Sequence, residues 1–418
     1  MRAALTTQLQ AQGWDVEHIL LREQKIGNCA GEFFCWVRTP GVCIIKDDNR
    51  TISAAIIASD LMIYLTPVTF GGYSSALKRI VDHQIQNISP FFAKIEDETH
   101  HQKRYEKYPD FLAVGWMDTF NAQDEAVFQY LVQRNALNWH AKTYVSGVLL
   151  ASQSDGEMLA LTQNWLNELQ HSQSSPRVTL PISSASSNTA PDIRRALLLV
   201  GSPKTHKSTS NSLGGYLLER LSAQSIETET IYLHTILRSP EKMQSLFNSI
   251  DAADLVMLAF PLYVDSLPAP VIEALERIAA HRQSREIRQQ VFTAIANCGF
   301  PEAHHNETAL AICETFARQS GFEWAGSLAL GGGGMIDGAP LAQRGGQTAR
   351  IRQSLDMAAE ALVQGQAVPK AAQDLLGKPM IPHWLYRLMA GFSWKQRAKP
   401  YGAEKSLTKQ PYETKDKR

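Results

Sequence analysis

The sequence has no long apolar run, no surplus of either charge and few cysteines, and each of these absences removes a class of protein. No stretch approaches the roughly 18 to 20 apolar residues that a helix needs to cross a bilayer. Lys plus Arg equals Asp plus Glu, with 41 of each, so no global field attracts nucleic acid. The five cysteines are an odd number and follow no apolar secretory leader, which predicts a reducing cytoplasm rather than a disulfide scaffold.

The chain does contain an alternation of strand and helix patterns over 418 residues, a length that predicts about two to three domains. Such alternation predicts the α/β class, with parallel sheets covered by helices on both faces. In the first half, the helix patterns cover residues 1–12, 52–58, 74–83 and 156–170. The strand patterns of that half cover residues 16–21, 60–66, 111–116 and 145–150.

Composition divides the chain into four segments. Residues 173–192 are rich in Ser and Pro, which predicts a linker between a first domain at 1–172 and a second at 193–368. The tail at 369–418 is aromatic and then basic, with nine Lys or Arg against three Asp or Glu from residue 387 onward. A tail of this kind either lies on a membrane surface or packs as an arm across another domain.

The most informative stretch is residues 196–213, ALLLVGSPKTHKSTSNSL. An apolar strand at 196–200 runs into a loop of small hydroxyl residues, and Asn211 or Ser212 is positioned to cap the helix that follows. Backbone N–H groups at a helix N-terminus bind phosphate, so this loop predicts an anion site. An ordinary strand-to-helix turn is the alternative. The candidate ligands are Ser202, Lys204, Ser208, Thr209, Ser210 and Asn211.

This loop resembles the flavin-phosphate loop of the flavodoxin-like NADPH-dependent FMN reductases. It has neither G-x-x-x-x-G-K-[ST] nor G-x-G-x-x-G, the patterns for nucleoside triphosphates and dinucleotides. The resemblance implies a five-stranded parallel sheet of order 2-1-3-4-5 in the second half. Its strands are expected at residues 196–200, 230–233, 254–260, 291–296 and 326–330, with helices that include 270–280 and 350–364.

Two further loops are expected at the same edge of that sheet. Residues 260–268 resemble the P-L-Y-x-x-x-x-P loop that lies against the flavin ring in the reductase family. Residues 297–302 follow the fourth strand, where Gly299 permits a close backbone approach. The resemblance implies that the ring pocket is formed by Pro261, Leu262, Tyr263, Val264, Asn297, Gly299 and Phe300.

The first half repeats the plan of the second incompletely. The interval from Asp60 to Pro67 recurs as Asp254 to Pro261, at an offset of 194 residues. Upstream the offset is nearer 213, which places the counterpart of Gly201 before Met1. We therefore expect the first sheet to lack its first strand and phosphate loop, because the chain is truncated or begins late, or because this half has lost the cofactor.

Residues 28–43 resemble the cysteine segment of the iron–sulfur flavoproteins. Cys29, Cys35 and Cys43 are present, but Glu32 stands at the second cysteine position, and a four-iron cluster requires four thiolates. No metal site is therefore expected; the thiols are either buried beside aromatic side chains or include a Cys29/Cys35 redox pair. The residues 100–101, both His, are expected to be solvated in a charged loop.

Together, the resemblances imply an FMN-dependent NAD(P)H oxidoreductase that reduces a quinone, a flavin or a small electrophile. Because the flavin carries the chemistry, no catalytic side chain is expected, and none of the Ser-His-Asp type is found. Family members are commonly homodimers, so a homodimer is expected here. The alternative is a non-catalytic protein with the same fold, either an electron carrier or a scaffold.

Overall fold

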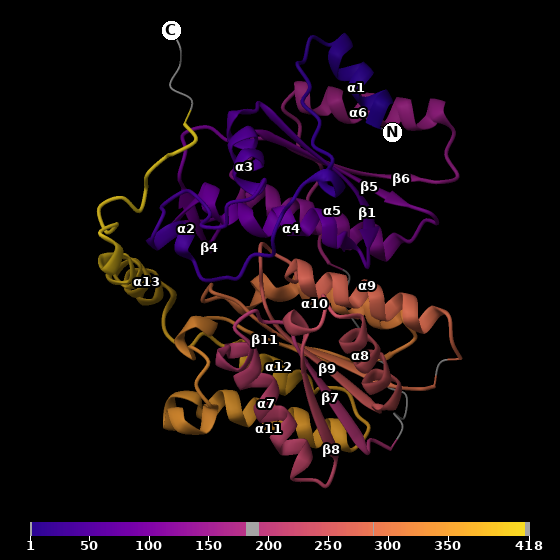
Figure 1. The fold of residues 1–418 in the computed structure, drawn as a ribbon, viewed down its shortest axis with the longest axis vertical. Helices are drawn as coiled ribbons and strands as arrows, with labels where there is room; N and C mark the ends of the chain where they lie inside the picture. The colour runs from indigo at the N-terminus through magenta and orange to yellow at the C-terminus, as the bar shows by residue number, and fades with distance from the viewer. Residues whose placement is uncertain (1, 181–191, 287, 414–418) are drawn as a thin grey trace. The chain divides into compact units, whose positions relative to one another are not determined.

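The structure is a computed structural model that describes residues 2–180, 192–286 and 288–413 (Figure 1). Its contacts divide the chain into two compact units. Unit 1 comprises Met1–Ile95, His100–Pro181 and Arg387–Arg418, and unit 2 comprises Glu96–Thr99 and Ile182–Tyr386. The centre of the predicted linker, residues 181–191, lies outside the described residues.

Unit 1 is built on a four-stranded sheet of order β2-β1-β5-β6. The strands are β1 (Leu61–Thr69), β2 (Gly72–Tyr73), β5 (Asp110–Met117) and β6 (Tyr144–Leu150). The pairs β1–β5 and β5–β6 are parallel, whereas the short β2 returns antiparallel to the end of β1. These three parallel strands confirm the strands predicted at 60–66, 111–116 and 145–150.

Helices cover both faces of this sheet. Leu5 and Leu9 of α1 (Arg2–Ala11) pack with Leu166 of α6 (Asp155–Gln170) against alternate residues of β5 and β6 on one face. On the other face, α5 (Ala122–Asn138) brings Phe128 against β5, where a Cβ at Gly115 would meet its ring. The remaining elements are η1 (Leu21–Glu23), α2 (Phe34–Val37), α3 (Asn49–Ala58), α4 (Ser75–His83), η2 (Gln84–Asn87) and the hairpin β3 (Ile88–Ile95) and β4 (Glu98–Lys103).

Two predictions for unit 1 are wrong. The segment predicted as a strand at 16–21 forms no regular element until the single 3-10 turn η1. A strand needs a neighbour to pair with its N–H and C=O groups, and no described strand offers one there, so this sheet lacks a counterpart of the second strand as well as the first. The histidines expected in a solvated loop instead lie in β4, where His100 is fully buried.

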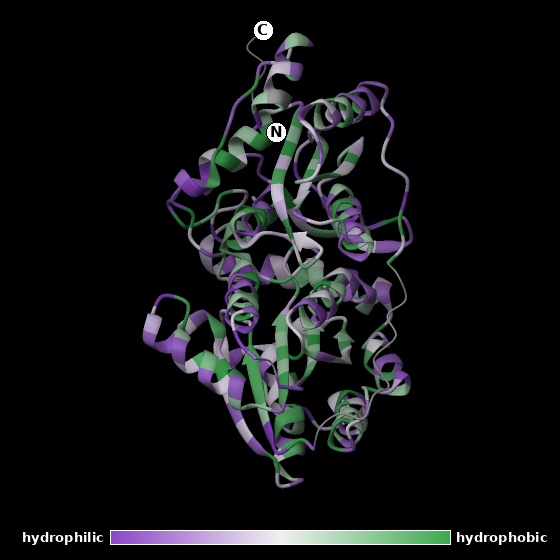
Figure 2. Ribbon diagram, turned by 90° about the vertical axis from the view of Figure 1, so that its right-hand side faces the viewer, coloured by the Kyte–Doolittle hydropathy of each residue, from purple (hydrophilic) through white to green (hydrophobic). Residues whose placement is uncertain are grey.

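Unit 2 is built on a five-stranded sheet in which every neighbouring pair is parallel. The strands are β7 (Arg195–Val200), β8 (Glu227–Tyr232), β9 (Leu255–Pro261), β10 (Val291–Asn297) and β11 (Glu323–Leu330). Their spatial order, β8-β7-β9-β10-β11, is the predicted 2-1-3-4-5 order. Both faces are buried, which is why β7, β9 and β10 have nearly continuous apolar sequences (Figure 2).

Three helices lie on each face of this sheet. Leu213 of α7 (Thr209–Ser222), Leu355 of α11 (Ala349–Val363) and Leu376 of α12 (Lys370–Gly377) share one apolar core with alternate strand residues. The other face carries α8 (Pro240–Ala252), α9 (Ala269–Gln283) and α10 (Glu307–Gln319). Short 3-10 turns complete the unit: η3 (Thr205–Lys207), η4 (Leu233–Thr235), η5 (Ala303–Asn306), η6 (Gly333–Met335) and η7 (Leu341–Thr348).

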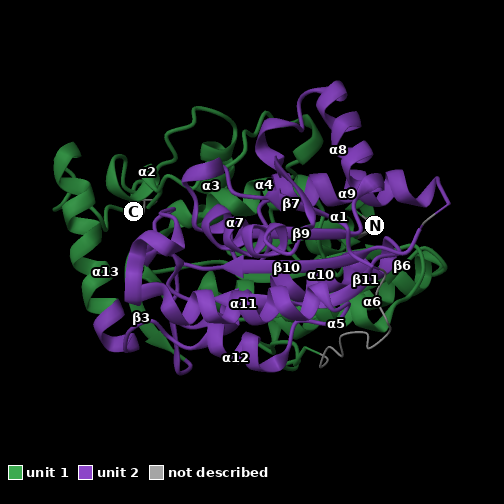
Figure 3. Ribbon diagram, turned by 90° about the horizontal axis from the view of Figure 1, so that it is seen from below, with its two compact units in different colours: residues 1–95, 100–181, 387–418 green, residues 96–99, 182–386 purple. Residues whose placement is uncertain are grey.

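The tail divides between the two units, which Figure 3 colours separately. Helix α12 completes the core of unit 2, and α13 (His383–Ala398) contains the boundary between Tyr386 and Arg387. After η8 (Lys399–Tyr401), the chain packs on unit 1, where the Arg104 guanidinium donates to the carbonyls of Leu407 and Lys409. No helix among the described residues is both long and apolar enough to cross a membrane.

Candidate functional site

The predicted phosphate loop lies between β7 and α7 of unit 2, and Ser208 caps the helix. The Ser208 hydroxyl accepts a hydrogen bond from the Asn211 N–H at 3.1 Å and donates one to the Thr205 carbonyl at 2.6 Å. The prediction that Asn211 or Ser212 caps the helix is therefore wrong. Ser208 takes this role because its backbone is extended while the following residues are already helical.

The first turn of α7 leaves two N–H groups open. The Asn211 and Ser212 N–H groups are satisfied by Ser208, but no acceptor in the described part of the chain faces the N–H groups of Thr209 and Ser210. The Ser210 hydroxyl accepts from Asn297 and the Ser202 hydroxyl accepts from the Lys204 N–H, so both keep a proton to donate. Two amides and two hydroxyls at the positive end of a helix fit the phosphate of a mononucleotide.

The Asn297 side chain links the three loops that the sequence places at this edge. Its Nδ2 donates to the Ser210 hydroxyl and to the Phe260 carbonyl, each at 2.9 Å. Its backbone carbonyl accepts from the Leu262 N–H at 2.8 Å. Because Asn297 is buried, these bonds are shielded from water and fix the end of β10 against the phosphate loop and the loop after β9.

The loop after β9 closes in a tight turn. Tyr263 and Ser266 exchange backbone hydrogen bonds of 2.9 and 3.1 Å across Val264 and Asp265. Both central residues have a positive φ, 45° for Val264 and 57° for Asp265. Residues other than glycine adopt such a backbone conformation at an energetic cost. The turn leaves Leu262, Tyr263 and Val264 half-buried at the edge of the sheet.

The loop after β10 contains both exposed and buried residues. Gly299 is exposed, no atom lies within 4 Å of its Cβ position, and its carbonyl accepts from the Tyr386 hydroxyl at 2.6 Å. Phe300 stacks on the His305 ring, with 4.3 Å between centroids. Cys298 points inward: burial raises the pKa of its thiol to about 12, so it is a neutral, packed group at neutral pH.

Glu302, which the sequence did not single out, is the charged centre of this loop. It accepts from the backbone N–H and the hydroxyl of Thr99, at 3.2 and 2.8 Å, and lies 3.3 Å from His383 Nδ1. Burial raises its pKa, but the hydrogen bonds from His305 and Thr99 outweigh burial and lower the pKa to about 2. The carboxylate is therefore ionised throughout the neutral range. Thr99 is distant in sequence, so no local pattern signalled this contact.

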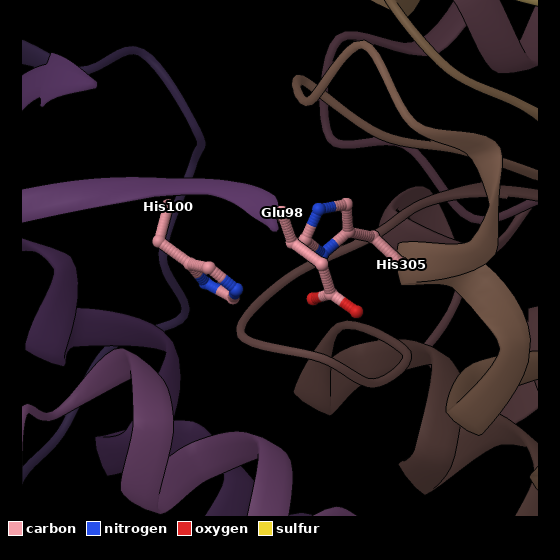
Figure 4. A group of neighbouring side chains, drawn as sticks. All are labelled: Glu98, His100 and His305. Atoms are coloured by element: carbon pink, nitrogen blue, oxygen red, sulfur yellow. The ribbon is translucent and has the colours of Figure 1, made fainter. Parts of the chain in front are cut away.

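Acidic and imidazole groups continue around this carboxylate within unit 2. His304 Nε2 lies 3.1 Å from Glu98 Oε1, and the His304 and His305 rings stack at 4.9 Å. Figure 4 shows Glu98 and His305 together with His100, the first residue of the chain's return to unit 1. In unit 1, His100 Nδ1 lies 2.9 Å from Asn138 Oδ1.

The glycine-rich segment after β11 lies directly on the phosphate loop. A Cβ at Gly338 would come within 2.8 Å of the Ser208 nitrogen, and the Gly333 carbonyl accepts from the Thr209 hydroxyl at 2.8 Å. Glycine is required at residue 338 because the backbones meet there and its φ is 71°. The hydroxyl proton of Thr209 is thus used within the protein, whereas its N–H is not.

In unit 1, the three cysteines of the predicted segment line one pocket with Glu32 and His83. Cys43 Sγ lies 3.6 Å from His83 Nδ1, and His83 Nε2 lies 2.8 Å from the Gly27 carbonyl. Burial raises the thiol pKa of all three cysteines, and their mutual proximity raises that of Cys29 and Cys35 further. They are neutral thiols in this structure, and all five cysteines of the chain are free.

A doubly wound sheet with a mononucleotide-type phosphate loop defines a flavodoxin-like protein. The model of the NADPH-dependent FMN reductase family matches residues 2–95 and 194–319, more than half of the chain and both of its units. The chain belongs to this family, whose members are oxidoreductases that use FMN and NAD(P)H.

Parts of the chain are similar to several solved structures at low identity. A flavone reductase is 11% identical over 41% of this chain and 65% of its own, with a TM-score of 0.32. A putative quinone reductase from Klebsiella pneumoniae is 16% identical over 42% and 87% of the two chains, with a TM-score of 0.31. An NAD(P)H:quinone oxidoreductase from Methanothermobacter marburgensis is 17% identical over 41% and 98%, with a TM-score of 0.30. No curated protein matches the chain.

Proposed function

We propose that unit 2 holds FMN at the carboxyl edge of its sheet and that the chain reduces a small acceptor, a quinone, a second flavin or another electrophile, at the expense of NAD(P)H. When bound, FMN supplies the chemistry, because it accepts a hydride and passes the electrons on. The tasks left to the protein are to bind the phosphate, to orient the ring and to exclude water from it.

The phosphate end of the proposed site rests on the first turn of α7. The N–H groups of Thr209 and Ser210 and the hydroxyls of Ser202 and Ser210 donate to the phosphate. Lys204 adds a positive charge at the exposed rim of the loop. Ser208 and Asn211 act indirectly: the first holds the turn, and the second accepts from the Tyr232 hydroxyl at 3.0 Å, which fixes the helix end to β8.

The ring end of the proposed site is formed by the loops after β9 and β10. Pro261, Leu262, Tyr263 and Val264 supply one wall, and Gly299 and Phe300 supply the other, where the absence of a side chain at Gly299 leaves room for a planar ring. The tight turn at Val264 fixes the first wall before any ligand arrives. Such preorganisation reduces the loss of conformational freedom on binding.

The observation that carries the proposal is the contact between Asn297 and Ser210, since one buried side chain joins the phosphate end to the ring end. We expect Asn297→Ala to weaken FMN binding about tenfold, because it removes two hydrogen bonds that hold the loops together. Asn248→Ala, at an exposed position on α8, is the matched control. FMN fluorescence quenching measures both affinities, and equal affinities in the two variants would contradict the proposed site.

The purified chain distinguishes the competing functions by its spectrum. A protein that retains no flavin absorbance after incubation with FMN and removal of the unbound flavin is a scaffold. One that retains flavin but is not bleached by NADPH or NADH is an electron carrier. We propose a homodimer in the cytoplasm, a reducing compartment that suits five free cysteines. Measurement of the mass in solution tests the dimer.

A further inference from the structure

Helix α13 presents an apolar stripe to solvent. Trp384, Leu388 and Phe392 are spaced four residues apart and therefore lie on one face of the helix. Their side chains are 64%, 69% and 65% exposed, and the neighbouring Met389 is 50% exposed. Large apolar side chains are usually exposed singly, so a row of four on one helix marks a surface for interaction.

Contacts near both ends hold α13, so the exposed stripe does not belong to a detached helix. Near its start, the Tyr386 hydroxyl donates to the Gly299 carbonyl. Near its end, Trp394 meets the Trp36 ring edge-on, with 5.0 Å between centroids, and Ala398 is fully buried. Each end of α13 is thus held by the unit to which it belongs, while the stripe between them is exposed.

The surroundings of the stripe are basic. From His383 to Tyr401 the sequence contains no acidic residue, but it contains Arg387, Lys395, Arg397 and Lys399. Lys395 and Lys399 are exposed and form no ion pair with any residue that the structure describes. An apolar stripe flanked by unpaired positive charge is complementary to an anionic lipid surface, where the apolar side chains enter the acyl boundary and the lysines face the headgroups.

We propose that α13 is a membrane-surface helix that docks this protein on anionic lipid. A second copy of the chain fits the stripe less well because helical periodicity puts Lys395 on the same face as Trp384 and Leu388, next to Phe392. Lysine is depleted from the centres of protein interfaces, whereas at a membrane its ammonium reaches the headgroup layer while its stem stays among apolar groups. The helix has 16 residues, which suits a position in the surface plane.

The first test uses the intact protein and two kinds of vesicle, phosphatidylcholine alone and phosphatidylcholine mixed with phosphatidylglycerol. We expect sedimentation with the mixed vesicles, little with the neutral ones, and release when the salt concentration is raised. Failure of the intact protein to sediment with the mixed vesicles would overturn the proposal.

Two sets of variants locate the binding surface. We expect Leu388→Ser combined with Phe392→Ser to weaken vesicle binding at least about tenfold, because two apolar side chains no longer leave water. Leu159→Ser, at a position 43% exposed on α6, is the matched control. We expect each of Lys395→Gln and Lys399→Gln to weaken binding about fivefold on the mixed vesicles only.

Two results would reject α13 as the lipid-binding surface: unchanged vesicle binding by the double serine variant, or a halved mass in solution for that variant with vesicle binding retained. The second result would assign the stripe to an interface between copies of the chain. FMN affinity and NADPH oxidation in vesicle-free buffer are expected to stay unchanged in these variants. The membrane proposal and the flavin proposal can therefore fail separately.

Discussion

The two units have the same backbone turn after corresponding strands, β1 and β9, and the phosphate loop proposed for unit 2 precedes that turn in the chain, between β7 and α7. In unit 1, Phe70 and Gly71 have positive φ values of 53° and 79°, and the chain returns as β2. In unit 2, Val264 and Asp265 have values of 45° and 57°, at the same offset of 194 residues that relates Asp60 to Asp254. The turn thus belongs to the shared framework, and it does not by itself define a flavin site.

The paired aspartates show what a missing strand changes. Asp254 accepts from the backbone N–H groups of Arg194 and Arg195 at 2.9 and 2.8 Å, beside the start of β7, and its side chain is 14% exposed. Asp60 has no such neighbour among the described residues; it pairs with Lys107 and is 68% exposed. The same residue is half-buried and hydrogen-bonded to the start of a strand in unit 2, and is an exposed charge in unit 1.

The largest expected effect tests the N-terminus of α7, where the phosphate site is proposed. We expect Ser210→Asp to weaken FMN binding at least about a hundredfold, since a carboxylate would occupy the positive helix end and repel the phosphate. Because Ser210 is buried, the larger charged side chain also lowers the thermal unfolding midpoint, and its favourable interaction with the helix N-terminus offsets only part of that loss. Flavin fluorescence titration and circular dichroism measure the two quantities separately.

The neutral variant Ser210→Asn serves as the control for size. We expect it to bind FMN much more tightly than Ser210→Asp, because it adds bulk without charge. If the two variants bind FMN equally weakly, crowding rather than charge is responsible, and the electrostatic argument for an anion at this helix end fails.

The next effect tests the shared turn in unit 1. A Cβ on Gly71 would lie 2.7 Å from the Val127 Cβ, and its φ of 79° disfavours any side chain. We expect Gly71→Ala to lower the free energy of unfolding by about 2 kcal/mol. Gly156→Ala is the control, because nothing lies within 4 Å of that Cβ position in α6, and it should stabilise slightly. Urea unfolding distinguishes the two, and equal midpoints would contradict this account of the turn.

We expect substitution of the more buried aspartate, Asp254, to lower the free energy of unfolding more than substitution of Asp60. We expect Asp254→Asn to cost about 1 to 2 kcal/mol, because it weakens charge-assisted bonds to two N–H groups and to Arg288. Asp60→Asn should cost under about 0.5 kcal/mol, as exposed ion pairs contribute little. Urea unfolding midpoints of the two variants measure this difference.

The pH dependence provides the second check on Asp254. Burial raises the pKa of this carboxyl, but the Arg194 and Arg195 N–H groups and Arg288 together lower it below its ordinary value of 3.8. The stability that the Asp254 carboxylate contributes is therefore fully present above pH 3.8, and it is lost as the pH falls through the lower pKa of the folded state. In Asp254→Asn this part of the decrease in unfolding free energy at low pH should be absent, whereas in Asp60→Asn it should still occur.

Sequence patterns predicted the sheet of unit 2 because strands buried on both faces have apolar sequences such as that of β7. They were less informative where long-range contacts decide. A run of hydroxyl residues offers several helix caps, and only the extended backbone of Ser208 selects one. Glu302 depends on Thr99, 203 residues away. The apolar residues at 16–21 had the composition of a strand, but no strand lies beside them among the described residues.

The smallest expected effect sharpens the comparison of the two turns. Val264 holds a β-branched side chain at a φ of 45°, where unit 1 has Phe70, followed by Gly71. Val264→Gly removes that strain but also a half-buried apolar side chain and some rigidity of the unfolded chain, so the free energy of unfolding should change by less than about 1 kcal/mol. Its effect on FMN affinity should be larger, about threefold to tenfold weaker, because the ring wall is no longer fixed before binding. A variant that lost stability but retained full FMN affinity would show that this turn serves the fold alone.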